Sequence, residues 1–208
     1  MDFATILQQL SSGMIKTVGI FFWTLALSLP FGLVIAFGRM SKNKLVSSIF
    51  KFYISVMRGT PLMLQLLVVY FGPYYLFGIK LSQGYRFIAI IIGFVLNYAA
   101  YYAEIYRSGI ESMPVGQYEA ATQLGYSKSQ TFFKIILPQV IKRILPAITN
   151  EVITLVKDTS LAFSLAKMVS SPSVSKKALS TAILILFLLK STILPLRFVT
   201  FKFITLPQ

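Results

Sequence analysis

Two acidic residues lie seven positions apart in an otherwise apolar stretch of this chain. Glu151 and Asp158 belong to the segment ILPAITNEVITLVKDTSLAFSLA, residues 144–166. Because seven residues make about two helical turns, both carboxylates are expected on one face of a helix. A carboxylate in hydrocarbon is costly unless it is paired or hydrated. The pair therefore predicts either a polar cavity for a cationic group or a buried ion pair, with Lys157 or Arg86 as the partner of Asp158.

A second polar row precedes this segment. Its residues are spaced four, three, four and three positions apart, which places them on one helical face that must look toward protein or water. The row consists of Asn97, Tyr101, Glu104, Ser108 and Glu111. Glu104 is a candidate for the same site as the two later carboxylates. The alternative is an ion pair with Arg58 or Arg107 that fixes helix packing.

A break in a third apolar segment adds two more candidates. Pro61 biases Thr60 away from helical geometry, so a kink or break is expected at this point. Breaks in membrane helices expose backbone groups to a ligand. Thr60 and Gln65 are therefore predicted to contact a ligand, and the alternative is that they only pack helices together.

The elements that must position these residues are membrane helices. The chain has 208 residues, of which 56% are hydrophobic and 12% are charged, and its mean hydropathy is +0.74. A soluble domain has about a quarter charged residues. At roughly 20 apolar residues per crossing, we expect an all-α integral membrane protein, one transmembrane domain over residues 1–208 with about five spans. The expected spans are 14–38, 61–78, 87–110, 144–166 and 178–196, of which the last is the least clearly marked by the sequence.

Charge and missing residue types exclude several functions. The net charge is +14, which favours basic cytoplasmic loops that meet anionic lipid, such as the loop 39–51, over a nucleic-acid partner. The chain has no cysteine and no histidine, which removes thiol chemistry, histidine-based triads and most metal sites. It also lacks a G-x-x-x-x-G-K phosphate loop, so we expect no hydrolysis of ATP by this chain and no cofactor of its own.

A polar helical hairpin is expected over residues 114–131. Pro114 can begin a helix, and Gly125 offers the left-handed conformation that ends one. Ser127 and Gln130 have the spacing of a capping box, which predicts a second helix. Lipid does not require such a hairpin, whereas a cytoplasmic protein partner can grip it.

The same stretch carries a family signature. E-A-A, a glycine and I-x-L-P stand at fixed spacing, at Glu119, Ala120, Ala121, Gly125, Ile135, Leu137 and Pro138. This pattern resembles the inner-membrane permease subunits of ATP-binding-cassette importers, which have the type I, MetI-like fold. The blocks RGTPL (58–62), AYYAEIYRSGI (100–110) and LVKDTSLA (155–162) are similar to those of the polar amino-acid permeases.

The resemblance implies partners and a mechanism. In that family two permease subunits pair, as copies or paralogues, in the bacterial plasma membrane, where each subunit crosses several times. The hairpin, through Glu119, Ala120, Ala121 and Gly125, docks on a cytoplasmic subunit that binds ATP. An extracytoplasmic binding protein delivers the amino acid, which crosses by alternating access. The permease itself is not an enzyme.

Substrate and integrity of the chain stay open at this point. Glu151 would suit a second amino group, which favours a cationic, diamino or cystine-like substrate. The alternative functions are a stand-alone ion-coupled amino-acid transporter or channel, and a membrane anchor without transport. Residues 166–208 depart from the family pattern, with no acidic residue and no glycine. A change of reading frame around residues 166–170 is one hypothesis for this tail.

Overall fold

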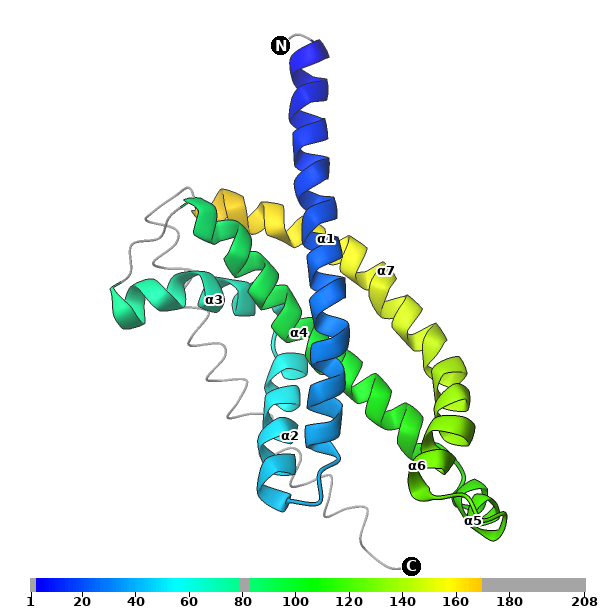
Figure 1. Cartoon of the computed structure of the whole chain (residues 1–208). Coiled ribbons are helices and arrows are strands. Elements are labelled where there is room, and N and C mark those ends of the chain that lie inside the picture. Colours follow the sequence, from blue (N-terminus) through cyan, green and yellow to red (C-terminus); the bar gives the residue numbers. More distant parts are fainter. Residues whose placement is uncertain (1–2, 79–82, 170–208) are drawn as a thin grey trace, which may run out of the picture.

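The chain folds as an assembly of helices. The computed structural model describes residues 3–78 and 83–169, and all regular elements in these two ranges are helical, which confirms the expected fold class. In chain order the elements are α1 (Phe3–Arg39), α2 (Lys44–Gly59), α3 (Leu62–Phe77), α4 (Gln83–Glu111), α5 (Val115–Gln123), α6 (Lys128–Gln130), the π-helical turn η1 (Thr131–Ile136) and α7 (Leu137–Val169) (Figure 1).

Two helices of the described part are long and apolar enough to cross a membrane. They are Ser11–Arg39 within α1 and Phe87–Glu111 within α4, and a third crossing results if α2 and α3 count as one broken span. α7 contains the predicted span 144–166 but is not among them. The segment 178–196 lies outside the described residues, so the number of five spans stays a prediction.

α1 crosses α4 where both helices carry small residues (Figure 1). A Cβ atom on Gly32 would lie 2.8 Å from the Cβ of Tyr102 and 3.1 Å from the carbonyl oxygen of Ala99. Ala36 and Ala103 are buried in the same region. Small residues let the backbones of two membrane helices approach closely, so Gly32 sets the distance between α1 and α4.

The predicted break at Thr60 and Pro61 is confirmed. Thr60 has φ −124° and ψ 146°, and Pro61 has φ −62° and ψ 134°, so both leave the helical region. α2 and α3 consequently meet at an angle of 111°. α3 then ends at Gly78, whose φ of 67° is left-handed.

The prediction of a basic loop over 39–51 is wrong for most of that range. α2 already begins at Lys44, where the side chain of Asn43 accepts a hydrogen bond of 3.0 Å from the backbone N–H of Leu45. The residues of α2 that pack on α1 and α4 recur with helical spacing, at Phe50, Tyr53, Ile54 and Met57. This apolar face and the asparagine cap stabilise a helix where basic residues had suggested a loop.

The main core lies where α3, α4 and α7 meet. Tyr98 and Tyr102 of α4 are 2% and 0% exposed and pack with Phe94, Leu66 and Leu155. Both tyrosine rings therefore pack in the protein interior. Tyr101, in contrast, is only half-buried and borders a cavity described below.

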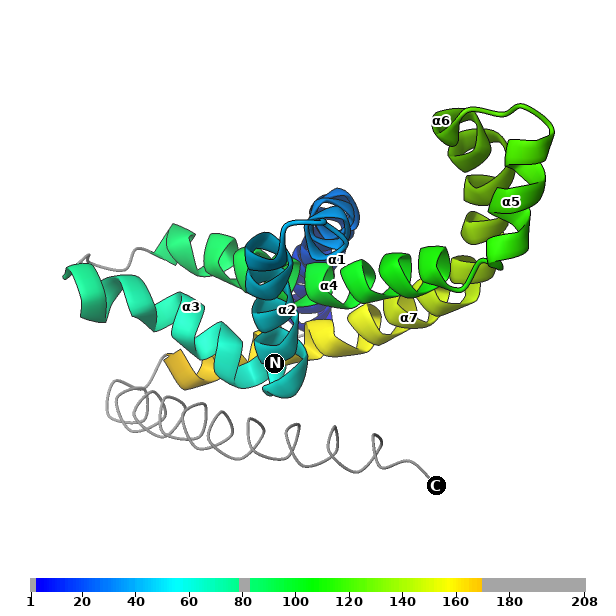
Figure 2. The same cartoon turned by 90° about the horizontal axis from the view of Figure 1, so that it is seen from below.

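The hairpin projects from one end of this assembly. In Figures 1 and 2, α5 and α6 stand at the end of α4 and the beginning of α7, away from α3. Gly125 adopts a φ of 79° as predicted. The capping box is also present, with Gln130 N–H donating to Ser127 Oγ over 3.3 Å and Ser127 N–H to Gln130 Oε1 over 2.9 Å.

The second arm of the hairpin joins α7 through a π-helical turn. In this turn, η1, the N–H of Leu137 donates to the carbonyl of Phe132, five residues earlier. Pro138 follows directly and has no N–H to offer an ordinary helical hydrogen bond. The wider turn accommodates the proline, and α6, η1 and α7 follow one another without an intervening loop.

Candidate functional site

Asp158 on α7 is bound by a tyrosine of α4. Tyr98 Oη donates a hydrogen bond of 2.7 Å to Asp158 Oδ2, and the aspartate is half-buried. The ion pairs among the described side chains involve neither Asp158 nor Lys157. The alternative of an ion pair between these two residues is therefore not present. The side chain of Arg86 lies outside the described residues. Asp158 therefore keeps one carboxylate oxygen without a hydrogen-bond donor in the described part of the chain.

Glu151 lies seven residues before Asp158 on α7 and is also half-buried. Its charge and that of Asp158 both act on the hydroxyl of Tyr98, and the charge of Arg58 acts on Glu151. Both carboxylates therefore lie close enough to Tyr98 for their charges to act on its hydroxyl. The charge of Glu151 also acts on the hydroxyl of Tyr102, which is buried and has no hydrogen-bond partner in the described structure.

Thr60 and Gln65 hold the break between α2 and α3. Gln65 Nε2 donates to Thr60 Oγ1 over 2.6 Å and to the carbonyl of Met57 over 2.9 Å. Asn97 of α4 donates to Gln65 Oε1 over 2.9 Å. Both amides are more than nine-tenths buried. This network explains the packing role of Thr60 and Gln65, whereas a contact with substrate stays a prediction.

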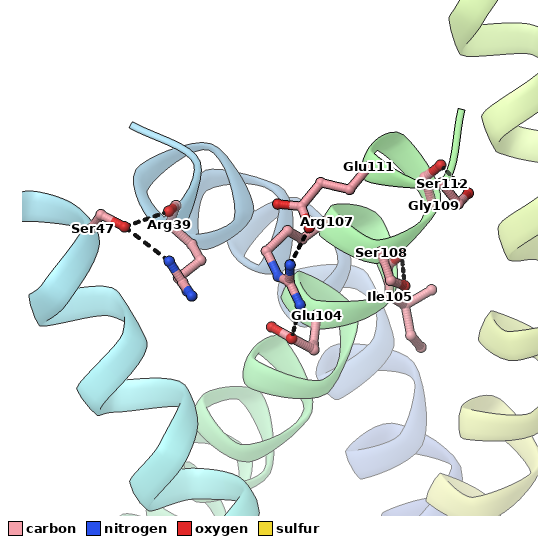
Figure 3. A network of polar contacts seen from close by, with 9 residues as sticks. All are labelled: Arg39, Ser47, Glu104, Ile105, Arg107, Ser108, Gly109, Glu111 and Ser112. Carbon is pink, nitrogen blue, oxygen red and sulfur yellow. Dashed lines mark hydrogen bonds and ion pairs between the residues drawn. The ribbon is translucent and has the colours of Figure 1, made fainter. Parts of the chain in front are cut away.

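Glu104 forms an ion pair with Arg107, one of the two alternative partners predicted from the sequence. Arg107 binds both Glu104 and Glu111 through its two terminal nitrogens (Figure 3). All three residues belong to α4, so this pair does not join two helices and cannot fix their packing as expected. Glu104 remains half-buried, and Arg58 and Arg39 of neighbouring helices act on its charge.

A cavity of about 360 Å³ opens between α1, α2 and α4 beside Glu104. Its lining includes Arg39, Lys51, Ser55, Arg58 and Tyr101. The guanidinium carbon of Arg58 lies 5.1 Å from the centre of the Tyr101 ring, within range of a cation–π contact. Sequence reasoning missed this cavity, although Lys44, Lys51 and Arg58 recur every seven residues and so share one helical face.

The hairpin presents its signature residues unevenly. Glu119 and Ala120 are exposed, whereas Ala121 is 1% exposed and packs inward. Gly125 forms the exposed turn. Large apolar side chains are also exposed in this part of the chain, at Val115, at Leu124 beside the turn and at Phe133 in η1.

The hairpin is firmly attached to α7. The side-chain amides of Gln117 and Gln139 exchange two hydrogen bonds of 3.0 and 2.9 Å. Arg143 Nη1 donates to the carbonyl of Ser112 over 2.9 Å. Where α4 passes α7, a Cβ atom on Gly109 would lie 2.3 Å from a methyl carbon of Ile144. The hairpin, the end of α4 and the beginning of α7 therefore form one tightly packed unit.

Comparison with known proteins gives a consistent result. The model of the family "Binding-protein-dependent transport system inner membrane component" matches residues 28–201. That match extends through most of the tail 166–208, whose residues from 170 onward lie outside the described structure.

Among curated proteins, the chain is 38% identical to the "Arginine transport system permease protein ArtQ" of Bacillus subtilis over 164 residues, 77% of this chain and 74% of that protein. It is 43% identical to the "L-cystine transport system permease protein TcyL" of the same species over 153 residues, 70% of this chain and 64% of the relative.

The "Putative glutamine transport system permease protein GlnP" of Rickettsia felis is 39% identical over 140 residues, 67% of this chain. The chain spans 63% of the length of that relative, which is less than two thirds.

Two solved structures are similar in fold. "Crystal structure of an amino acid ABC transporter with histidines" has a TM-score of 0.69 and 30% identity, and covers 92% of this chain and 95% of that chain. The inward-facing MetNI methionine ABC transporter has a TM-score of 0.56 over the same shares of the two chains, with 16% identity. The second likeness shows the fold alone.

Proposed function

This chain belongs to the family of binding-protein-dependent transport system inner membrane components, and we propose that it is the permease subunit of an ATP-driven importer of polar amino acids. In this role it provides the path through the bacterial plasma membrane, which it crosses several times as one domain of residues 1–208. A separate cytoplasmic subunit binds and hydrolyses ATP, an extracytoplasmic binding protein delivers the amino acid, and a second permease copy or paralogue completes the path.

The observation that carries this proposal is the attachment of the exposed hairpin to the helix that bears Asp158. The hairpin offers Glu119 and Ala120 to a partner, and Gln117 ties it to Gln139 of α7. From there α7 continues for 19 residues to Asp158, about 28 Å at 1.5 Å per residue. A displacement of the hairpin by the ATP-hydrolysing subunit would therefore be carried along α7 toward Asp158.

The hydrogen bond between Tyr98 and Asp158 supports a site for a cationic group. Asp158 has a free carboxylate oxygen among the described contacts, and Glu151 adds a second negative charge toward the same tyrosine. Two carboxylates favour a substrate with an additional cationic group, of the arginine or cystine type, over a neutral side chain. Thr60, Gln65 and Glu104 would border the path rather than bind the cation, because protein groups already occupy them.

The coupling role is tested by placing equal backbone strain at two glycines. Gly125 in the hairpin and Gly78 at the end of α3 both have left-handed φ, and a Cβ atom added at either residue would meet no atom within 4 Å. Gly125→Ala and Gly78→Ala should each cost about 1–2 kcal/mol locally. In proteoliposomes containing the ATP-hydrolysing subunit and the binding protein, only Gly125→Ala should lower ATP-driven uptake and substrate-stimulated ATP hydrolysis. Equal losses for both variants would contradict coupling through the hairpin.

The substrate class is tested at Asp158. Asp158→Asn should reduce uptake of arginine by about tenfold or more, equal to about 1.4 kcal/mol, with a much smaller effect on glutamine. An unchanged ratio of arginine to glutamine uptake would refute the cation site while leaving the permease assignment intact. Uptake by the chain alone, without the ATP-hydrolysing subunit, would instead favour the stand-alone transporter.

A further inference from the structure

The cavity between α1, α2 and α4 gathers positive charge that no ion pair within the described chain neutralises. Arg39, Lys51 and Arg58 all line it, and Glu104 is the acidic residue beside them. The ion pairs among the described residues connect Glu104 and Glu111 with Arg107. The three cations of the cavity therefore face a carboxylate that already has a partner, which leaves an excess of positive charge for an anion.

Two of these cations are held in place. Arg39 Nη1 donates to Ser47 Oγ over 2.9 Å, and Ser47 Oγ donates to the carbonyl of Arg39 over 2.7 Å, so the side chain is fixed between α1 and α2 (Figure 3). Arg58 lies over the ring of Tyr101. Both guanidinium groups are thus positioned before any ligand arrives, and guanidinium geometry matches phosphate oxygens well.

The end of the cavity at Arg39 lies at a membrane boundary. Arg39 is the last residue of the membrane-spanning segment Ser11–Arg39, so its side chain is expected at the depth of lipid headgroups. Next to the basic face of α2 lies an exposed apolar face with Leu45 and Ile49, which are 70% and 60% exposed. A helix with a basic face and an adjoining apolar face is typical of contact with anionic lipid at the bilayer interface.

We propose that this cavity binds the phosphate group of an anionic phospholipid in the leaflet on the hairpin side. Arg39 and Lys51 hold the phosphate near the boundary, Arg58 adds positive charge deeper in the cavity, and the acyl chains run inward along α2 past Ile49. The bound lipid braces α2 against the end of α1. This inference concerns the membrane environment of the chain and does not depend on which amino acid crosses.

The test uses the full chain in an uncharged maltoside detergent and native mass spectrometry. The ligands are dioctanoyl phosphatidylglycerol, the zwitterionic dioctanoyl phosphatidylcholine and inorganic phosphate. The wild type should retain phosphatidylglycerol in preference to phosphatidylcholine, and millimolar phosphate should not displace it. The double variant Arg39→Gln/Lys51→Gln should bind it about 25-fold more weakly, at about fivefold for each charge.

Matched variants separate a local site from net charge and from misfolding. Lys128→Gln/Lys134→Gln removes two exposed charges, one in α6 and one in η1, and should retain the lipid. Lys51→Glu changes one exposed side chain and should lose it with an unchanged thermal transition.

Three results would overturn the proposal. Equal retention of phosphatidylcholine would show binding without regard to charge, and equal losses in both double variants would show binding to net charge alone. Displacement of the lipid by phosphate would identify a site for a free anion instead.

Discussion

The contact between Gly109 of α4 and Ile144 of α7 yields the most sharply defined prediction. A Cβ atom on Gly109 would lie 2.3 Å from Ile144 Cγ2 and 3.3 Å from Val140 Cγ1, whereas ordinary contacts begin near 3.4 Å. Ile144 is β-branched and in a helix, so its side chain has little freedom to rotate away. Gly109→Ala should therefore overpack this contact and destabilise the chain by about 1–3 kcal/mol.

A double-mutant cycle isolates the effect. Ile144→Ala alone should cost about 2–5 kcal/mol because it deletes buried methyl groups. In the double variant Gly109→Ala/Ile144→Ala the overlapping methyl carbon is absent. The double variant should therefore lose less free energy of unfolding than the two single variants together, by about 1–3 kcal/mol. Unfolding in mixed micelles with increasing sodium dodecyl sulfate, followed by circular dichroism, measures the three free energies. Gly72→Ala is the control, because a Cβ there meets no atom within 4 Å.

Two results would contradict this close contact: Gly109→Ala as stable as Gly72→Ala, or additive losses for the two substitutions at the contact. Either result would mean that α4 and α7 are farther apart near the hairpin than the structure shows. The hairpin would then lack its tight attachment to α7, and the transmission of movement to Asp158 would lose its physical basis.

Substitutions at three further contacts test other parts of the structure. Gly32→Leu should separate α1 from α4 and prevent stable folding, because the nearest atoms include backbone atoms that cannot yield; a normal melting curve would argue against the close crossing. Tyr98→Phe should lower stability by about 1.5–3 kcal/mol because it loses a hydrogen bond to a carboxylate. Asp158→Asn keeps an acceptor for this bond and should retain stability. Equal stabilities of the two variants would reject this distinction. Asn97→Leu leaves the buried Gln65 Oε1 without its donor, which should lower stability by about 1–3 kcal/mol. The double variant Asn97→Leu/Gln65→Leu should recover part of that stability. Additive losses would count against the network.

Local signals in the sequence anticipated the hairpin and the break well. The left-handed turn at Gly125, the capping box of Ser127 and Gln130, and the interruption at Pro61 depend on a few neighbouring residues, and each is present in the structure. The beginning of α2 could not be read as clearly, because its basic residues favour a loop whereas the cap at Asn43 and the apolar face that follows favour a helix.

The candidate site could be predicted only in part. The seven-residue spacing of Glu151 and Asp158 was readable, but the partner of Asp158 was not, because Tyr98 lies 60 residues earlier in the chain. The cavity likewise combines Arg39 with residues of α2 and α4. Such contacts arise from the crossing of helices, which depends on close approaches such as that at Gly32 and leaves no periodic signal of its own.

The central claim is that the hairpin docks on an ATP-hydrolysing subunit at the cytoplasmic face. The chain contains no cysteine, so Ala120→Cys introduces a single exposed thiol. The control is Ser11→Cys, near the beginning of α1 and far from the hairpin (Figure 1). In membranes that contain the complete transporter, the thiol at position 120 should cross-link to the ATP-hydrolysing subunit and react with an impermeant maleimide only from the cytoplasmic side. Labelling of position 120 from the outside, or cross-linking that is no stronger than at position 11, would contradict the account.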